Sequence, residues 1–580
     1  MLPWGWENIL CVCKIPRMLT MDPQAQASHA LELFHAGSFE QARALSITLL
    51  EDARLAAGVA AEMEHLLGAC LHQLARGEEA LPHLRRAIGL EPANAGYLNT
   101  LGVVLRKLKR TDQAIRCYER VIALQPDFSD VYYNCGNALS EQKRTEEAVG
   151  RFRRCLELNP RHHSAHHNLA NALRDLKELE AALHHYELSD QCEHHNPDMH
   201  CNWGLAWQLQ ERWDKAIDSF ELAINQKADH AASHINLGGA LAVQERFDEA
   251  CAALRRGVEL DDSCNDAKFN LGLTLLTIGQ YEEGWKFYDT RLSLPDKVKP
   301  PIASPIWDGN LDIDAPLLVW AEQGYGDNIQ FARYLPILME LGLQVTLSTR
   351  KPLMELFRQC LKPQCPAIID HNPSELQGFK HHVPLLTLPR IFRTSIQTVP
   401  MMPGYLQAPP ILAPSLKFDR QPFAINIGLV WASGVDNKDM YADKSMPLEL
   451  LLPLFDIWRQ ERLVVLHSLQ VGADAAQLEP WRGQRGVVDW SPKLDTFLDT
   501  ASVLSQLDLV ISVDTAVAHV AGGLDKPTWL LLQHNADFRW LRGRADTPWY
   551  PNMSLIRQKK LGDWSSVVEQ VQDRLQQLLG

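Results

Sequence analysis

The chain has 580 residues, which is too long for a single hydrophobic core, so several domains are expected. Its 57 basic and 71 acidic side chains give a formal charge of −14, which argues against a nucleic-acid coat or a membrane-surface protein, because both need a local excess of basic residues. Hydrophobic residues make up 46% of the sequence, an ordinary value for a folded protein, and no apolar run reaches the ~18 residues of a transmembrane helix.

The N-terminal segment, residues 1–20, reads MLPWGWENILCVCKIPRMLT and lacks the long apolar stretch and small-residue cleavage site of a signal peptide. We expect it to be a disordered extension, with Met21 as an alternative start. The 12 cysteines are scattered and form no CxxC pair, so we interpret them as small buried apolar residues. A reducing cytoplasm is therefore the expected compartment.

Residues 21–298 carry a 34-residue period, with one degenerate repeat followed by seven in register. Small residues recur at two places in each repeat. The first place holds Gly68, Gly102, Gly136, Ala170, Gly204, Gly238 and Gly272, and the second holds Ala80, Ala114, Ala148, Ala182, Ala216, Ala250 and Gly284. A large ring or leucine follows the second place by four residues, at Leu84, Tyr118, Phe152, Tyr186, Phe220, Leu254 and Tyr288.

This spacing is typical of the tetratricopeptide (TPR) helix-turn-helix repeat. The small residues let two paired helices approach closely, and the large side chain fills the remaining gap. Pro92, Pro126 and Pro160 mark three repeat boundaries, because proline ends one helix before the next begins. Such repeats stack into a right-handed superhelix, an α-solenoid with a concave groove.

Five asparagines recur in the first helices of successive repeats, and we interpret them as a candidate peptide site in the groove. An amide carries both donors and acceptors, so a ladder of amides can bind an extended peptide backbone of any sequence. The alternative is that these residues only pack or hydrate the solenoid, because asparagine is common at this place in TPRs. A protein or peptide partner is expected at Asn134, Asn168, Asn202, Asn236 and Asn270.

Eight histidines crowd two of the repeats. Spacings of four on a helix could gather imidazoles around a metal ion, but no carboxylate or thiolate pattern completes a site. We therefore expect a solvated surface and no metal at His162, His163, His166, His167, His184, His185, His194 and His195.

Residues 299–314, rich in Pro and Asp, are expected to be a linker, and beyond them strands alternate with helices. Alternation predicts parallel sheets covered by helices, here two Rossmann-like lobes over 315–420 and 421–580. Ligands of such sheets bind at the carboxyl ends of the strands. The expected helices are 328–342 and 351–361, and the expected strands are 315–320, 344–348, 366–370, 425–431, 463–469, 508–513 and 528–532.

The first candidate site is the Glu-Gln-Gly-Tyr-Gly-Asp segment, 322–327, between an expected strand and helix. Gly324 and Gly326 permit a tight turn and a close backbone approach. Asp327 would then lie at a helix start, at the carboxyl edge of the sheet. The alternative is an aspartate that only caps the helix.

The second candidate is the strand-to-helix turn around Thr515. The free N–H groups of a helix that begins there, at Ala516, form an anion site, and the threonine adds a hydroxyl donor. His519 lies four residues on, so it can face the same place. The alternative is that Asp514 and Thr515 only cap the helix and that His519 is a packed core residue.

The third candidate is the polar loop 431–448, where Lys438 and Lys444 are available to meet a phosphate, although most loop lysines are merely solvated. The GxSxG, HExxH and GxxxxGK[ST] patterns are absent, which argues against a serine hydrolase, a zincin or a P-loop enzyme.

Residues 315–570 resemble the heptosyltransferase-like glycosyltransferases of GT-B fold, and in particular the bacterial group that carries this domain behind TPRs. The resemblance rests on four segments, WAEQGYGDNIQFARYLPIL, GLVWASG, LDLVISVDTAVAHVAGGLDKPTWLLL and FRWLRGRADTPWYPNMSLIRQ. The architecture is also similar to that of the O-linked N-acetylglucosamine transferases. The resemblance implies transfer from a nucleotide-diphosphate sugar. No DxD-like carboxylate pair stands in a context that fits a bound divalent metal, so we expect a metal-independent mechanism with no other cofactor.

The resemblance also implies roles for particular residues. Asp327 would be the base that deprotonates the acceptor. Thr515, Ala516 and His519 would meet the donor diphosphate, with Lys444 compensating its charge, although this chain has Lys-Ser-Met-Pro where many relatives have arginines. The leading hypothesis is thus a glycosyltransferase whose TPRs recruit a protein. The rival hypothesis is an interaction scaffold with a degenerate transferase domain.

Overall fold

The computed structural model describes residues 22–52, 55–192, 195–294, 302–322, 324–361, 365–372, 374–409, 413–434, 443–451 and 464–579. The expected extension at 1–20, His194 and Lys438 lie outside these ranges. The chain forms two compact units, of which the first ends at Asn236 and the second begins at Leu237, inside helix α15 (Ala231–Val243).

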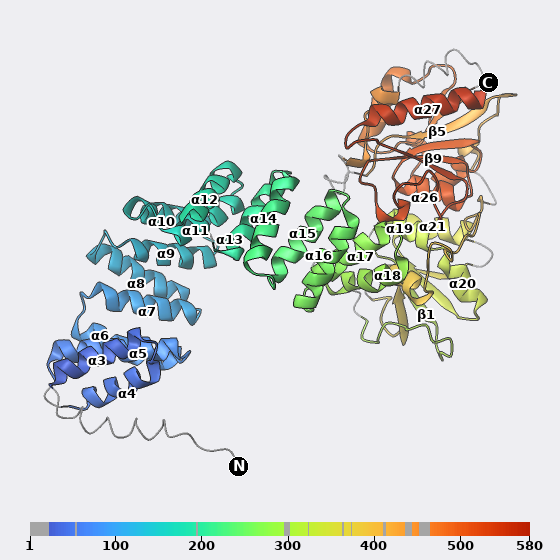
Figure 1. Ribbon diagram of the computed structural model, residues 1–580. Coiled ribbons are helices and arrows are strands. Elements are labelled where there is room, and N and C mark those ends of the chain that lie inside the picture. Colours follow the sequence, from blue (N-terminus) through green and yellow to red (C-terminus); the bar gives the residue numbers. More distant parts are fainter. Residues whose placement is uncertain are drawn as a thin grey trace. The chain divides into compact units, whose positions relative to one another are not determined.

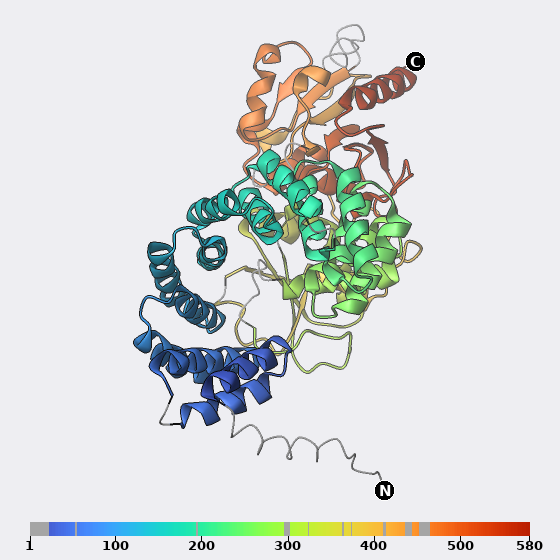
Figure 2. The same ribbon diagram turned by 60° about the vertical axis from the view of Figure 1, so that its left-hand side comes forward.

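The first unit consists of antiparallel helix pairs, each packed on the next (Figures 1 and 2). The helices are α3 (Pro23–His35), α4 (Phe39–Leu50), α5 (Ala57–Gln73), α6 (Gly77–Leu90), α7 (Ala95–Lys107), α8 (Thr111–Leu124), α9 (Ser129–Glu141), α10 (Thr145–Leu158), α11 (His163–Asp175), α12 (Leu179–Cys192), α13 (Pro197–Leu209) and α14 (Trp213–Gln226). The predicted helical array is confirmed over this half of the chain.

The repeat glycines lie where the predicted packing needs them. A Cβ atom on Gly102 would stand 2.5 Å from a ring carbon of Tyr118, and the same holds for Gly136 against Phe152. Three helices, α6, α8 and α10, end two residues before the marker prolines, so the predicted boundaries are confirmed as well.

Substitution of Gly102 tests this packing. We expect Gly102→Ala to destabilise the first unit by about 1–3 kcal/mol, because the added methyl must displace the buried Tyr118 ring. Gly150→Ala is the matched control, since it lies in the exposed interior of α10 with nothing within 4 Å and should gain about 0.5–1 kcal/mol from backbone entropy. Urea midpoints measure both variants, and equal midpoints would contradict the packing role.

The second unit begins with the last repeat helices and continues into two wholly parallel sheets. The helices are α16 (Phe247–Leu260), α17 (Asn265–Thr277) and α18 (Tyr281–Tyr288), followed by the 3-10 turn η1 (Asp289–Ser293). One sheet has the order β3-β2-β1-β4 and the other β10-β9-β8-β5-β6-β7. Their strands are β1 (Leu317–Trp320), β2 (Val345–Thr349), β3 (Ala367–Asp370), β4 (His381–Pro384), β5 (Ile425–Val430), β6 (Val464–Ser468), β7 (Val487–Asp489), β8 (Leu509–Val513), β9 (Thr528–Leu532) and β10 (Met553–Arg557).

All seven predicted strands are present within a few residues, and β4, β7 and β10 were not predicted because they are short or partly polar. The single helix predicted for 328–342 is wrong. The chain instead forms α19 (Tyr325–Phe331) and α20 (Tyr334–Glu340). Pro336 lies in the first turn of α20, where its missing N–H is tolerated, whereas the middle of one long helix would lose a hydrogen bond there. Helix α21 (Lys351–Cys360) agrees with the prediction.

The last repeat shares its hydrophobic core with the α/β region. Tyr281, Trp285 and Tyr288 of α18 belong to the same buried cluster as strands of both sheets, and the Trp285 ring lies 6.0 Å from that of Phe331 in α19. The predicted linker is described over 302–314, where the Trp307 N–H donates to the His382 carbonyl of β4 at 2.7 Å. These repeat helices are therefore part of the scaffold that carries the sheets.

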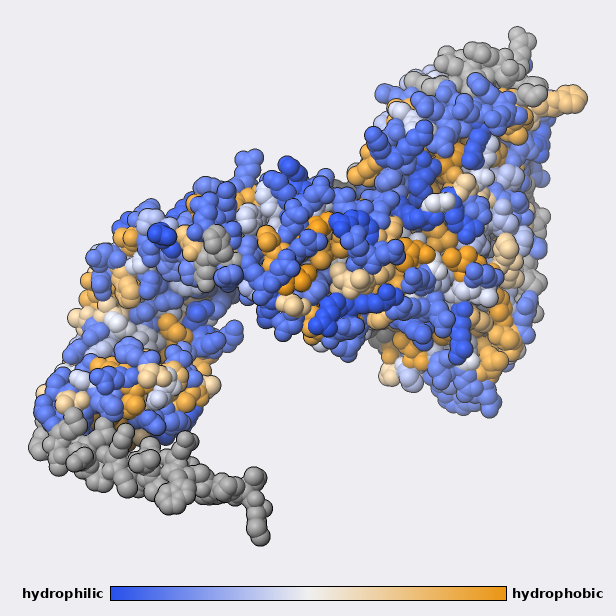
Figure 3. All heavy atoms as spheres, in the orientation of Figure 1, coloured by the Kyte–Doolittle hydropathy of each residue, from blue (hydrophilic) through white to orange (hydrophobic). Residues whose placement is uncertain are grey.

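The surface of the described chain is predominantly hydrophilic on the face seen in Figure 3, with small scattered apolar areas. Across the described ranges, none of the helices combines the length and apolar character needed to cross a bilayer.

Candidate functional site

The first two candidate segments meet where the carboxyl ends of β1 and β8 approach each other. Helix α19 follows β1 and packs directly against α26 (Ala516–Gly523), which follows β8. The approach is close, because a Cβ atom on Gly326 would stand 2.7 Å from Cδ2 of His519. The two glycine-containing motifs therefore form one site at the junction of the sheets.

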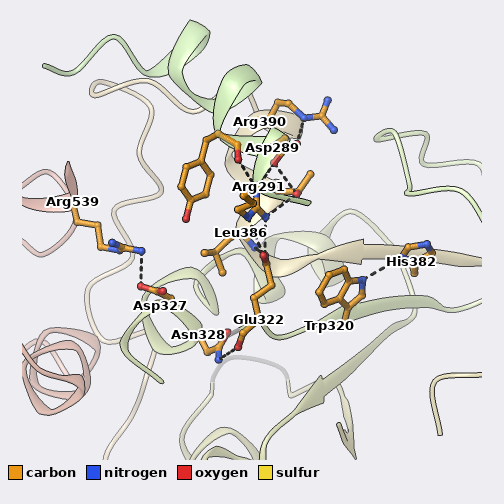
Figure 4. Close-up of polar contacts among 12 residues, drawn as sticks. Asp289, Arg291, Trp320, Glu322, Asp327, Asn328, His382, Leu386, Arg390 and Arg539 are labelled. Atoms are coloured by element: carbon orange, nitrogen blue, oxygen red, sulfur yellow. Dashed lines mark hydrogen bonds and ion pairs between the residues drawn. The ribbon is translucent and has the colours of Figure 1, made fainter. Parts of the chain in front are cut away.

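Asp327 does not cap α19. Gly324 occupies the N-cap position with φ of 93°, and Asp327 lies in the first helical turn. Its carboxylate folds back over Gly324, where a Cβ atom would stand 2.6 Å from Oδ2. Nη2 of Arg539 lies 2.5 Å from Oδ1 in an ion pair, and 27% of the Asp327 side chain stays exposed (Figure 4). The carboxylate is thus oriented and still accessible.

The surroundings of Asp327 make it a stronger base than an ordinary aspartate. Burial raises its pKa to about 6, against the opposing effects of Arg539 and Lys444 and with further increases from Asp537 and Glu322. At neutral pH the group is ionised, yet it binds a proton about a hundredfold more tightly than a free aspartate. This combination suits general-base chemistry.

Arg539, which the sequence reasoning did not single out, is the cation nearest to Asp327 among the described contacts. It lies 8% exposed in η7 (Phe538–Trp540) and pairs with Asp327 and Asp537, each at 2.5 Å. Burial alone would lower the pKa of Arg539, but the two carboxylates raise it. The signal in the sequence is an arginine between Phe538 and Trp540, where an apolar residue would be expected.

Lys444 forms a buried ion pair with Asp514. Its Nζ lies 2.7 Å from Oδ2, with 13% and 7% of the two side chains exposed. Burial opposes the charge on each group, but their attraction prevails, raising the pKa of Lys444 and lowering that of Asp514. The lysine charge is therefore already compensated.

Thr515 is the N-cap of α26 through its backbone, and its side chain makes no capping hydrogen bond. Within the described ranges, the Thr515 hydroxyl shares a hydrogen bond with Ser512 Oγ at 3.3 Å. The capping alternative therefore does not describe the side chains of Asp514 and Thr515. Ala516 opens the helix, so its N–H group lies at the positive end of the dipole.

His519 matches the core-histidine alternative in its packing. Nδ1 lies 2.9 Å from the Tyr550 hydroxyl, the ring stacks on Trp540 at 5.3 Å, and burial lowers the pKa of His519 to about 3. The ring is therefore neutral at physiological pH and acts as a dipole rather than a cation.

Two buried acceptors after β9 have no partner in the described part of the chain, Oε1 of Gln533 and Oδ1 of Asn535. Val513 pairs with Leu531 across the sheet, so Gln533 lies level with Thr515 at the carboxyl end of the neighbouring strand. Buried acceptors normally have a donor. These two were not predicted, because Gln and Asn carry no motif of their own.

The asparagine ladder joins neighbouring repeats. Asn134 donates to Asn99 at 3.1 Å and Asn168 to Asn137 at 2.7 Å. Asn202 lies 3.2 Å from Nε2 of His167, and Asn236 donates to Sγ of Cys201 at 3.4 Å. Asn270 is exposed, and its backbone carbonyl accepts from Thr274 Oγ1 at 2.8 Å, but among the described residues its side chain is not seen to join a neighbouring repeat. The packing role is thus observed for four members, and peptide binding remains a prediction.

The histidine-rich repeats contain close ring pairs. Nδ1 of His166 lies 3.0 Å from Nδ1 of His185, and burial lowers the pKa of His185 to about 4. The described residues contain no group of three His, Cys, Asp or Glu side chains that could hold a metal ion.

Family models identify the repeats. The model described as "TPR repeat" matches residues 102–143, and the one described as "Tetratricopeptide repeat" matches 136–192, 204–263 and 244–290. The chain is a tetratricopeptide repeat protein. Its N-terminal half is a TPR solenoid, which suggests protein–protein interaction, and parallel sheets follow.

Similar proteins include Protein FlbA of Caulobacter vibrioides, which is 25% identical over 330 residues. The match covers 52% of this TPR protein and 54% of FlbA, so the chain spans about half the length of that relative. A solved structure of pilF from Pseudomonas aeruginosa is 22% identical, with 37% of this chain and 96% of that chain covered and a TM-score of 0.34. The TPR protein YrrB is 18% identical over 32% of this chain and 95% of its own, with a TM-score of 0.29.

Proposed function

We propose that the second unit is a glycosyltransferase that moves a sugar from a nucleotide-diphosphate sugar to an acceptor hydroxyl. The observation that carries this proposal is the junction of α19 and α26. There, a carboxylate with a pKa of about 6 lies on one side, and on the other lies a helix N-terminus whose Thr515 hydroxyl makes no capping hydrogen bond. The motif resemblance of residues 315–570 to GT-B transferases supports the same activity.

In the acceptor half of the reaction, Asp327 removes the proton from the acceptor hydroxyl as its oxygen bonds to the anomeric carbon. The bond from that carbon to the diphosphate oxygen breaks, and the electron pair leaves with the diphosphate. Arg539 orients the carboxylate, and Oδ2 remains for the incoming hydroxyl.

In the donor half, negative charge grows on the leaving diphosphate. The N–H groups at the start of α26, the hydroxyl of Thr515 and the neutral ring of His519 supply fixed dipoles for it. Lys444 adds little net charge because Asp514 pairs with it. Gln533 and Asn535 offer acceptors for hydroxyls of the donor.

Replacement of Thr515 tests the donor half. We expect Thr515→Val to weaken binding of a nucleoside diphosphate by about 1.5–3 kcal/mol, because a hydrogen bond to a charged group is lost while the shape is kept. Thr515→Ser keeps the hydroxyl and should bind within a few-fold of the parent. Calorimetry measures both, and equal affinities for the valine and serine variants would place the diphosphate elsewhere.

The second candidate function, a scaffold without catalysis, is favoured by one observation. Both cations at the junction, Lys444 and Arg539, are already paired with carboxylates. Hydrolysis of a panel of nucleotide sugars by the purified protein separates the candidates. Turnover of one nucleotide sugar supports the transferase hypothesis. If the protein neither turns over a nucleotide sugar nor binds a diphosphate, the scaffold hypothesis is supported instead.

A further inference from the structure

The strongest feature outside the junction is a buried arginine at the end of the repeat array. Arg291 lies in η1, directly after α18, and is 4% exposed. Nε and Nη2 donate to the two carboxylate oxygens of Glu322 at 2.9 and 2.7 Å, a bidentate pair (Figure 4). Nη1 donates to Asp289 at 2.6 Å, and Nη2 also reaches Thr387 Oγ1 at 3.2 Å. The guanidinium therefore has defined partners on three sides.

Glu322 lies two residues after β1 and contacts α19, the helix that carries Asp327. Its carboxylate also accepts the Leu386 N–H at 3.3 Å, and its backbone carbonyl accepts from Nδ2 of Asn328 at 3.0 Å. Asn328 is buried and adjoins Asp327 in α19. Glu322 is thus held by its side chain against the repeat array and by its backbone against the helix that carries the carboxylate.

The charges of this cluster balance. Arg291 and Arg390 face Asp289 and Glu322, and within the described part of the chain Arg390 pairs with Asp289 and not with Glu322. A buried ion pair seldom stabilises a fold more than apolar side chains of similar size would. What a bidentate arginine–carboxylate pair adds is a fixed geometry. The pair therefore fixes where Glu322 and the start of α19 lie.

We propose that Arg291 is a positioning residue, through which the end of the repeat array fixes Glu322 and the start of α19, and with them the carboxylate of Asp327. The proposal rests on the proposed function in one respect, namely that Asp327 is the base. It makes the last repeat a part of the active-site scaffold.

The charge of Arg291 has a second effect, on the titration of Asp327. Without Arg291, the Glu322 carboxylate loses its counter-charge and disfavours the ionised form of Asp327 more strongly, so the pKa of Asp327 rises further above about 6. The loss of activity on acidification, which is the acid limb of the pH–rate profile, then moves to higher pH. The other groups that face Asp327 stay in place, namely Arg539, Asp537, Lys444, Tyr288 and the neutral His519.

The experiment compares Arg291→Gln with Arg390→Gln in the full chain. Both remove one cation that contacts Asp289, but only the first removes the contact with Glu322. Hydrogen exchange of the 320–331 amides should accelerate at least about tenfold in Arg291→Gln and stay within about twofold in Arg390→Gln. Arg291→Lys keeps the charge but cannot form the bidentate pair, and it replaces the glutamine variant in this comparison if that variant does not fold. The double variant Arg291→Gln/Glu322→Gln should recover part of the protection.

Activity gives the second readout. Arg291→Gln should lower kcat for donor hydrolysis at least about tenfold, because a small misplacement of the base has a large effect, while the donor KM changes little. Its acid limb should lie at higher pH than that of Arg390→Gln. Unchanged exchange with an unchanged pH profile would overturn the positioning role, even in an active enzyme. Altered exchange in a protein that hydrolyses no nucleotide sugar would support the positioning role and overturn the proposed function alone.

Discussion

Replacing Asp327 with asparagine is expected to lower the rate of sugar transfer by about 10²–10⁴-fold at neutral pH, because the amide cannot accept the acceptor's proton. Asparagine keeps the size of the side chain and can still accept a hydrogen bond from Arg539. Folding and diphosphate affinity should therefore change little. Steady-state rates, thermal unfolding and calorimetry on the same preparation measure these three quantities.

The pKa of Asp327 also predicts how the activity changes with pH. The pKa of Asp327 is raised to about 6, so the base is ionised above that pH and protonated below it. Activity of the parent should fall as the pH drops through about 6, and the asparagine variant should lack this limb. Asp537→Asn is the matched control, because Asp537 contacts the same arginine at the same distance and takes no proton in the proposed step. Transfer by Asp327→Asn at close to the parent rate would contradict the assignment.

Two truncations, one that starts the chain at residue 231 and one that starts it at residue 295, are expected to have opposite effects on folding. A chain of residues 231–580 keeps α16, α17, α18 and η1 and should fold, hydrolyse the donor and lose most transfer to a protein acceptor. A chain of residues 295–580 lacks Tyr281, Trp285 and Tyr288, three buried rings of the shared core. Each ring contributes roughly 1.5–3 kcal/mol, so their loss approaches the whole stability of a domain, about 5–15 kcal/mol.

Circular dichroism, urea unfolding and donor hydrolysis of the two truncated chains measure this difference. The full chain is the reference for acceptor transfer. Equal stability of the two truncated chains would show that the sheets need no repeat helix. Undiminished transfer by residues 231–580 would show that the earlier repeats serve assembly and not acceptor recruitment.

The sequence alone determined the features that depend on local periodicity. A 34-residue step of small and large residues predicts close helix pairs, and Gly102 against Tyr118 has that contact. Apolar runs such as 508–513, separated by helices, predict parallel strands, and β8 lies in a parallel sheet between β5 and β9. Such patterns repeat within a few residues or a few repeats, so the residues that carry them are near one another in the chain.

The tertiary structure decided which polar groups pair. It also decided which repeat helices share the core of the α/β region. Arg539 reaches Asp327, Lys444 reaches Asp514, and Arg291 of the last repeat reaches Glu322. Each pair joins residues far apart in the sequence, and any of several carboxylates could have been the partner on composition alone. Which ones meet is set by how the sheets and the last helix pair bury their apolar faces in one core, because only that packing brings the buried charges within reach of each other.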